Sequence, residues 1–186
     1  MLTLWQKKPK LNYSKDVLDI IQYGSSIEEG KDHNDIDIAV IFKDIPLEKQ
    51  LKEAQKIKKQ IRKYVDVKVD VNSFSFRTLF DESNFAREGI LIYGKSTITG
   101  KYFAEKLGFY PRIQIKYNLS KLEKKDKIRF NYMLSGKQGS YGLLRRINGK
   151  IISPGLIEIE PIYKEMIVKK ISQFTSDFEV MELLKT

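Results

Sequence analysis

The feature that most constrains this chain is a Gly-Ser turn followed, after a linker of nine residues (26–34), by two aspartates that alternate with isoleucine. The turn is Gly24-Ser25, and the aspartates are Asp35 and Asp37. A Gly-Ser turn can hold a phosphate through backbone N–H groups and a hydroxyl. Side chains two residues apart on a strand point to the same face of a sheet. Together these elements predict a site for a metal-bound nucleoside triphosphate.

Apolar runs and periodicity around this motif predict the elements that would position it. Residues 65–71 alternate strictly between valine and a charged residue, which is typical of a half-buried strand. Apolar residues recur at helical spacing after Pro46. The elements expected in this half are strands over 18–23, 35–42 and 65–71, helices over 47–64 and 76–88, and a short apolar strand over 89–94.

Asp66 and Asp70 compete for the role of a third carboxylate on the strand over 65–71. Both lie on one face of that strand, about 13 Å apart at ~3.3 Å per residue, so only one can be at the site. Asp70 is favoured because it lies at the far end of the strand, before the polar pair Asn72-Ser73.

The pattern of a hydrophobic residue, Gly-Ser, this linker, and then Asp-apolar-Asp-apolar is similar to the signature of the DNA polymerase beta-like nucleotidyltransferase superfamily. Glu88-Gly89 and the apolar run after it resemble a segment of its minimal, prokaryotic members. The resemblance covers about residues 14 to 94. It implies an α/β (α+β) fold with a mixed, twisted sheet and packed helices, and transfer of a nucleoside monophosphate from an NTP to a hydroxyl acceptor.

Nucleotidyl transfer needs charge neutralised on the attacking and leaving oxygens, which two Mg²⁺ (or Mn²⁺) ions do in the two-metal arrangement. Mg²⁺ prefers carboxylate and phosphate oxygens. The residues expected to bind the metal ions and to act in catalysis are Asp35, Asp37 and Asp70. Those expected to bind the nucleotide are Gly24, Ser25 and Ser26, ahead of an expected helix. Lys31 is either a further triphosphate contact or a solvated lysine.

The net charge of +10 is concentrated in the second half of the chain. Gly108 and Pro111 predict a boundary between a nucleotidyltransferase domain, 1–111, and a small basic α+β domain, 112–186. Residues 112–150 hold eleven Lys or Arg and two Asp or Glu, a net charge of +9. Within this segment we expect a basic helix over 115–134 and a hairpin around Asn148-Gly149.

A basic block of this density attracts a polyanion, or it is a solvated surface. Tyrosines beside basic residues can stack on unpaired bases. The candidate contacts with an RNA or DNA acceptor are therefore Lys124, Lys125, Tyr132, Tyr141, Arg145 and Arg146.

Composition excludes several other classes of site. The chain has no cysteine and one histidine, His33, so thiol nucleophiles, disulfides and multi-histidine metal sites are not expected. No signal peptide or membrane span is expected, and a cytoplasmic location is predicted. The alternatives to a nucleotidyltransferase are a nucleic-acid- or partner-binding module of low activity and an antitoxin-like protein that adenylylates a partner. The preferred NTP and the oligomeric state stay open.

Overall fold

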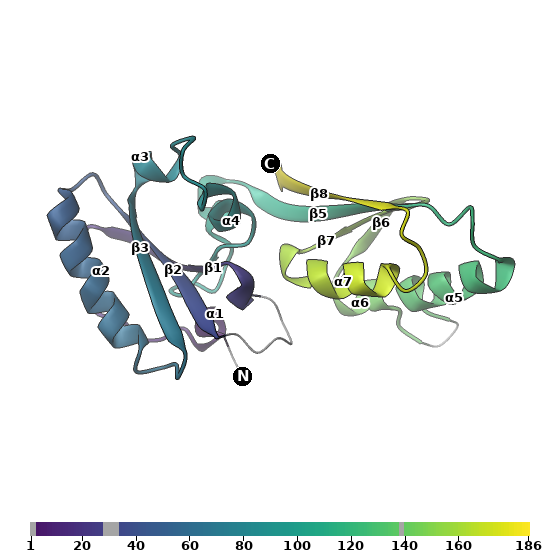
Figure 1. Ribbon diagram of the computed structural model, residues 1–186, viewed down its shortest axis with the longest axis horizontal. Coiled ribbons are helices and arrows are strands. Elements are labelled where there is room, and N and C mark those ends of the chain that lie inside the picture. Colours follow the sequence, from purple (N-terminus) through teal and green to yellow (C-terminus); the bar gives the residue numbers. More distant parts are fainter. Residues whose placement is uncertain (1–2, 28–33, 138–139) are drawn as a thin grey trace. The chain divides into compact units, whose positions relative to one another are not determined.

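The structure is a computed structural model, and it describes residues 3–27, 34–137 and 140–186. Lys31 and His33 lie outside the described residues. The chain divides into two compact units, one that extends to Tyr110 and one that comprises Pro111–Lys185. Each combines a four-stranded sheet with helices, so the fold is of the mixed α and β class (Figure 1).

The sheet of unit 1 has the strand order β3-β2-β1-β4. β1 is antiparallel to β2 and to β4, whereas β2 and β3 are parallel. The expected strands over 18–23 and 35–42 are confirmed. The strands are β1 Val17–Tyr23, β2 Asp35–Phe42, β3 Lys68–Ser75 and β4 Lys95–Ser96.

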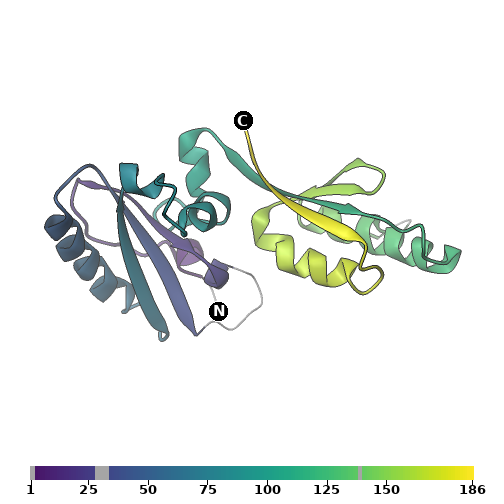
Figure 2. The ribbon, with the colours of Figure 1, turned by 45° about the horizontal axis from the view of Figure 1, so that its top comes forward.

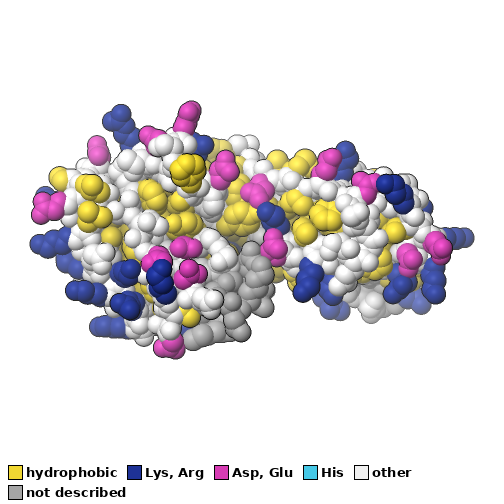
Figure 3. All heavy atoms as spheres, viewed as in Figure 1, with side chains coloured by type: hydrophobic (Ala, Val, Ile, Leu, Met, Phe, Trp, Pro, Cys, Tyr) yellow, Lys and Arg dark blue, Asp and Glu magenta, His cyan; other side chains and the backbone are white. Residues whose placement is uncertain are grey.

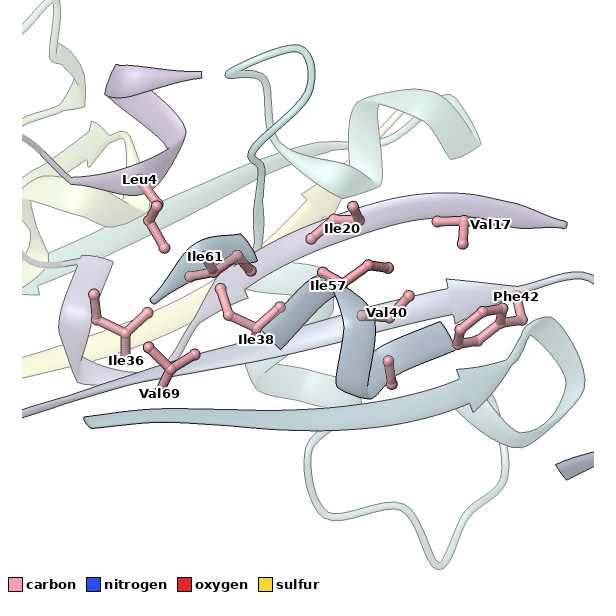
Figure 4. Close-up of a cluster of buried hydrophobic side chains, with 11 residues drawn as sticks. Leu4, Val17, Ile20, Ile36, Ile38, Val40, Phe42, Ile57, Ile61 and Val69 are labelled. Carbon is pink, nitrogen blue, oxygen red and sulfur yellow. The ribbon is translucent and has the colours of Figure 1, made fainter. Parts of the chain in front are cut away.

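Helix α2, Leu47–Ile61, covers one face of this sheet and confirms the helix expected after Pro46 (Figure 1). Alternate residues of β2 point toward this helix and form one hydrophobic cluster with it (Figure 4). The cluster also includes Leu4 from the short helix α1, Leu4–Lys7. Because β2 buries every second residue here, the intervening aspartates point to the opposite face. The fully buried members of the cluster are Leu4, Ile20, Ile38, Val40, Phe42, Ile57 and Ile61.

The segment after β3 differs from the expectation. The predicted helix over 76–88 is wrong for most of its length, because it is only the short helix α3, Phe76–Leu79, followed by turns. The predicted strand over 89–94 is also wrong, because these residues belong mainly to helix α4, Arg87–Ile92. A short apolar run bounded by glycines does not distinguish a strand from a buried helix. Gly94 allows this helix to end against β1, since a Cβ there would lie 2.8 Å from Ile21.

The buried carboxylate of Asp19 ties β1 to the segment that follows α4. Its Oδ1 accepts a hydrogen bond from Ser96 Oγ of β4 at 2.7 Å. Its Oδ2 lies 2.7 Å from Lys106 Nζ, in the 3₁₀ helix Phe103–Leu107. A carboxylate with no exposed surface requires such a partner, because the charge would otherwise be buried unpaired. Asp19 is therefore paired with Lys106 near the end of β1 that lies away from the Gly-Ser turn, which gives this aspartate a structural role.

Unit 2 has a sheet of order β6-β7-β5-β8 with its helices on one face, which Figures 1 and 2 both show. β7 is antiparallel to both β5 and β6. Phe130 of α5 packs against Tyr117 and Phe174, with ring centroids 4.8 and 5.4 Å apart. The elements are β5 Tyr110–Tyr117, α5 Lys124–Ser135, α6 Leu143–Arg146, β6 Lys150–Ser153, β7 Leu156–Ile159, the 3₁₀ helix Pro161–Tyr163, α7 Lys164–Ile171 and β8 Phe178–Lys185.

Two expectations for unit 2 are corrected. The helix expected over 115–134 begins only at Lys124, because Ile113 and Ile115 alternate with polar residues and are buried in β5. Asn148-Gly149 does not form a hairpin turn; it connects α6 to β6, and Asn148 has a φ of 55°. The hairpin lies instead between β6 and β7, where Gly155 has a φ of 80°.

Among the described residues, we find no helix with both the length and the apolar character needed to cross a membrane.

Candidate functional site

The strand register of unit 1 places Asp37 and Asp70 side by side. In the parallel pair of β2 and β3, Asp37 lies opposite Asp70, and Asp35 lies opposite Lys68. In the antiparallel pair of β1 and β2, Tyr23 lies opposite Asp37. Paired residues point to the same side of a sheet, so these side chains share the face away from α2. Figure 3 shows acidic side chains gathered around a basic one over β2 and β3.

Lys68 supplies the positive charge on this face. Its Nζ donates to Asp70 Oδ2 at 2.5 Å, and Lys58 Nζ from α2 lies 3.8 Å from Asp70 Oδ1. The hydrogen bond from Lys68 lowers the pKa of Asp70 below its ordinary value, and the charges of both lysines act in the same direction. The same contact raises the pKa of Lys68. Asp70 is therefore ionised and paired with both Lys68 and Lys58.

Asp37 has the opposite electrostatic environment. Burial is the largest cause that raises its pKa above the ordinary value, and the carboxylates of Asp35 and Asp70 raise it further. Lys68 opposes this shift but does not reverse it. The face therefore carries more negative charge than its lysines neutralise, which is the condition that favours an added cation.

Gly24 brings the backbone of the turn against the Asp37 carboxylate. Its φ is +75°, a conformation that favours glycine. A Cβ at this position would lie 2.7 Å from Asp37 Oδ2, so a side chain here would displace the carboxylate. Only glycine permits this approach between the turn that follows β1 and the acidic end of β2.

The two serines after Gly24 have different environments. Ser25 is exposed at the start of the 3₁₀ helix Ser25–Ile27, and the rest of the segment where a helix is expected lies outside the described residues. Ser26 is buried; its Oγ donates to the Tyr23 carbonyl at 3.2 Å and accepts from Gln22 Nε2 at 3.1 Å. The exposed Ser25 hydroxyl can therefore contact a ligand, whereas the Ser26 hydroxyl forms hydrogen bonds that stabilise the turn.

Tyr23 and Asn72 belong to the same face, although the sequence pattern did not single them out as site residues. Asn72 Nδ2 donates to the Tyr23 hydroxyl at 2.9 Å. Burial raises the pKa of Tyr23, and the charges of Asp37 and Asp70 add to this effect. The spacing of Asn72 two residues after Asp70 was the available signal, because it places both on one face.

The structure separates the two candidates for the third carboxylate. Asp66 is exposed in a bend before β3, and the pairing with β2 begins only at Lys68. Asp70 lies within the strand and faces Asp37. Within the described ranges, no three Asp, Glu, His or Cys side chains are close enough together to hold a metal ion. Asp37 and Asp70 lie opposite one another on β2 and β3, and Asp35 lies two residues before Asp37 on β2.

The candidate nucleic-acid contacts all lie in unit 2. The Arg145 guanidinium lies over the Tyr141 ring, 4.1 Å from its centroid, and Lys137 Nζ lies 5.7 Å from the centroid of Tyr132. Both tyrosines are exposed, by 47% for Tyr132 and 58% for Tyr141. The remaining candidates, Lys124, Lys125 and Arg146, are also exposed.

A scan against protein-family models finds no match to this chain, and no curated protein is significantly similar to it.

We expect Gly24→Ala to damage the site more than Gly108→Ala does. Both glycines have positive φ, of 75° and 82°, so each substitution costs about 1–2 kcal/mol of stability. A Cβ at position 108 meets nothing within 4 Å, whereas at position 24 it meets the Asp37 carboxylate. Urea unfolding should show a loss in both variants. Calorimetric titration with a non-hydrolysable NTP should show weaker binding in Gly24→Ala alone, and equal binding in both would contradict this account.

We expect Asp37→Asn to stabilise the fold near neutral pH. The raised pKa means that the folded state disfavours the charged carboxylate. This penalty is present above the raised pKa and disappears as pH falls below the unfolded value of about 3.9. Urea unfolding at about pH 7 should therefore show a gain over wild type that shrinks at about pH 3. Asp66→Asn, at an exposed bend, should change stability by no more than about 0.5 kcal/mol. A loss of stability in Asp37→Asn at neutral pH would contradict the prediction.

Proposed function

We propose that this chain is a nucleotidyltransferase of the DNA polymerase beta-like type, which transfers a nucleoside monophosphate from an NTP to a hydroxyl acceptor. The observation that carries the proposal is the register of unit 1. It places Asp37 opposite Asp70 and directly beside the Gly24 turn. A phosphate-binding turn in contact with paired carboxylates is what a metal-bound triphosphate requires.

The sheet of unit 1 supports the assignment of the fold. The motif residues lie at adjacent strand ends, because β1 leads into the turn and β2 begins at Asp35. The sheet is mixed, with β1 antiparallel and β3 parallel to β2. This is the mixed sheet with packed helices that the resemblance of residues 14–94 implies.

Asp37 and Asp70, paired across β2 and β3, are donors of the kind that suits Mg²⁺ or Mn²⁺. Carboxylate oxygens are the ligands these ions prefer, and the uncompensated negative charge around Asp37 favours a cation. Asp37 and Asp70 would hold the metal, and Asp35 would join them only after its side chain moved toward the pair, because the three carboxylates do not converge in the described part of the chain. Gly24 leaves the space beside Asp37 Oδ2 that a side chain would fill. When bound, the ions would neutralise charge on the attacking and leaving oxygens.

The residues of the chain itself would position the nucleotide. Backbone N–H groups of the Gly24 turn and the exposed Ser25 hydroxyl would bind triphosphate oxygens. The acceptor oxygen then bonds to the alpha-phosphorus as it loses its proton, the bond from that phosphorus to the bridging oxygen breaks, and pyrophosphate leaves. The hydrogen bond from Asn72 to Tyr23 joins β3 to β1 on the carboxylate face.

We expect Asp37→Ala and Asp70→Ala each to lower turnover by roughly 10³-fold or more, since metal-assisted charge stabilisation contributes several kcal/mol. The assay is release of pyrophosphate and transfer of label from each α-labelled NTP, with Mg²⁺ or Mn²⁺ and RNA, DNA or protein acceptors. Asp66→Ala removes an exposed carboxylate four residues before Asp70 and serves as the matched control, which should keep wild-type turnover.

Wild-type turnover by Asp37→Ala would overturn the assignment of the site. Loss of activity in Asp66→Ala with retention in Asp70→Ala would reverse the choice of the third carboxylate. NTP binding by the wild-type protein without transfer to any acceptor would favour a nucleotide-binding module over an enzyme.

A further inference from the structure

Unit 2 carries two exposed tyrosines, each with a cation beside its ring. We call Tyr132, Lys137, Tyr141 and Arg145 the cation–aromatic surface. Tyr132 lies in the last turn of α5 and Arg145 in α6, two helices that contact one another. Exposed aromatic rings are the groups on which unpaired bases stack, and an adjacent arginine or lysine adds attraction for the phosphate backbone.

The described residues at the two ends of the segment between these helices hold this surface. Gly136 and Gly142 lie against one another at its base, where a Cβ on Gly136 would lie 2.5 Å from Gly142 N. Lys137 N donates to Ser140 Oγ, and Ser140 N donates to the Lys137 carbonyl. Lys137 and Tyr141 therefore extend from positions that these contacts hold close together.

An open hollow of about 340 Å³ adjoins the surface and shares Arg145 with it. The exposed side chain of Ile151 gives it apolar surface, Leu134 and Leu144 are almost fully buried beneath it, and Arg145 and Asn148 are exposed polar residues of its lining. A hollow of mixed apolar and polar surface that includes a guanidinium and an amide suits one flat, polar-edged ring. Its lining residues are Leu134, Ser135, Leu144, Arg145, Asn148, Gly149 and Ile151.

The charge around this surface favours a polyanion. Residues 112–150 carry a net charge of +9, and their two acidic residues are Glu123 and Asp126. Asp126 is paired with Arg129 at 3.0 Å, so it neutralises a charge within α5. Lys124 and Lys125 are exposed at the start of α5. A phosphate backbone is the ligand that such an excess of positive charge attracts most strongly.

We propose that the cation–aromatic surface and its hollow bind single-stranded nucleic acid. Tyr141 stacks on an unpaired base at the hollow, and Arg145 and Lys137, with the lysines of α5, neutralise backbone phosphates. A single strand is favoured over a duplex because stacking on an exposed tyrosine needs a base whose face is free. The identification of this strand as the acceptor rests on the proposed function, but its binding does not.

The test is fluorescence anisotropy with a labelled oligonucleotide of about 12 nucleotides, in RNA, DNA and duplex forms, without nucleotide and with EDTA. Tyr141→Ala should weaken single-strand binding roughly 5- to 150-fold at unchanged salt dependence, because it removes one stacking platform and no charge. Tyr141→Phe should retain binding. Circular dichroism checks that each variant remains folded.

A pair of double variants separates this surface from diffuse charge. Lys137→Ala with Arg145→Ala should lower the slope of log affinity against log salt by roughly 1.4, since two phosphate contacts are lost. Lys169→Ala with Lys170→Ala removes the same charge from exposed positions of α7 and should leave the slope unchanged.

Three outcomes would overturn the proposal. They are no salt-dependent binding by the wild-type protein at low ionic strength, duplex binding as tight as single-strand binding, and equal effects of the two double variants. Asp37→Ala should bind the oligonucleotide as wild type does. Failure of the proposed transfer reaction would therefore be seen in the turnover assay and would leave this measurement intact.

Discussion

The parallel pairing of β2 with β3 is the constraint on which the site depends. It places Asp37 opposite Asp70 and, one pleat away, Asp35 opposite Lys68. The register is held because β2 buries alternate residues against α2. A slip of one residue would turn the aspartates into the hydrophobic cluster and the isoleucines out to solvent. Packing on one face of the sheet thus determines the chemistry of the other.

Much of unit 1 could be predicted from the sequence, because burial repeats there with a clear period. The strand over 35–42 and the helix after Pro46 are confirmed. The segment 89–94 was not predictable, since a short apolar run is equally compatible with a strand and with the buried helix that forms. The pairing of Lys68 with Asp70 depends on where the two side chains point, which the hydrophobic periodicity of the sequence does not indicate.

Unit 2 was harder to predict, because its signals are short and its turns are ambiguous. Asn148-Gly149 has the composition of a hairpin turn, yet it follows a helix, and the hairpin forms at Gly155. Tyr141 and Arg145 were candidates from composition alone. The contact of the Arg145 guanidinium with the Tyr141 ring and the close approach of Gly136 to Gly142 are visible only in three dimensions.

The central claim is that the Asp37–Asp70 face binds a divalent cation, and titration with Mn²⁺ alone, followed by electron paramagnetic resonance, tests it most directly. The wild-type protein should bind Mn²⁺, and Asp37→Asn should bind it far more weakly. Lys68→Met should bind it more tightly than wild type, because the ammonium that competes for Asp70 is gone, whereas Lys52→Met, on the exposed side of α2, should not. Equal Mn²⁺ binding by wild type and Asp37→Asn would contradict the account.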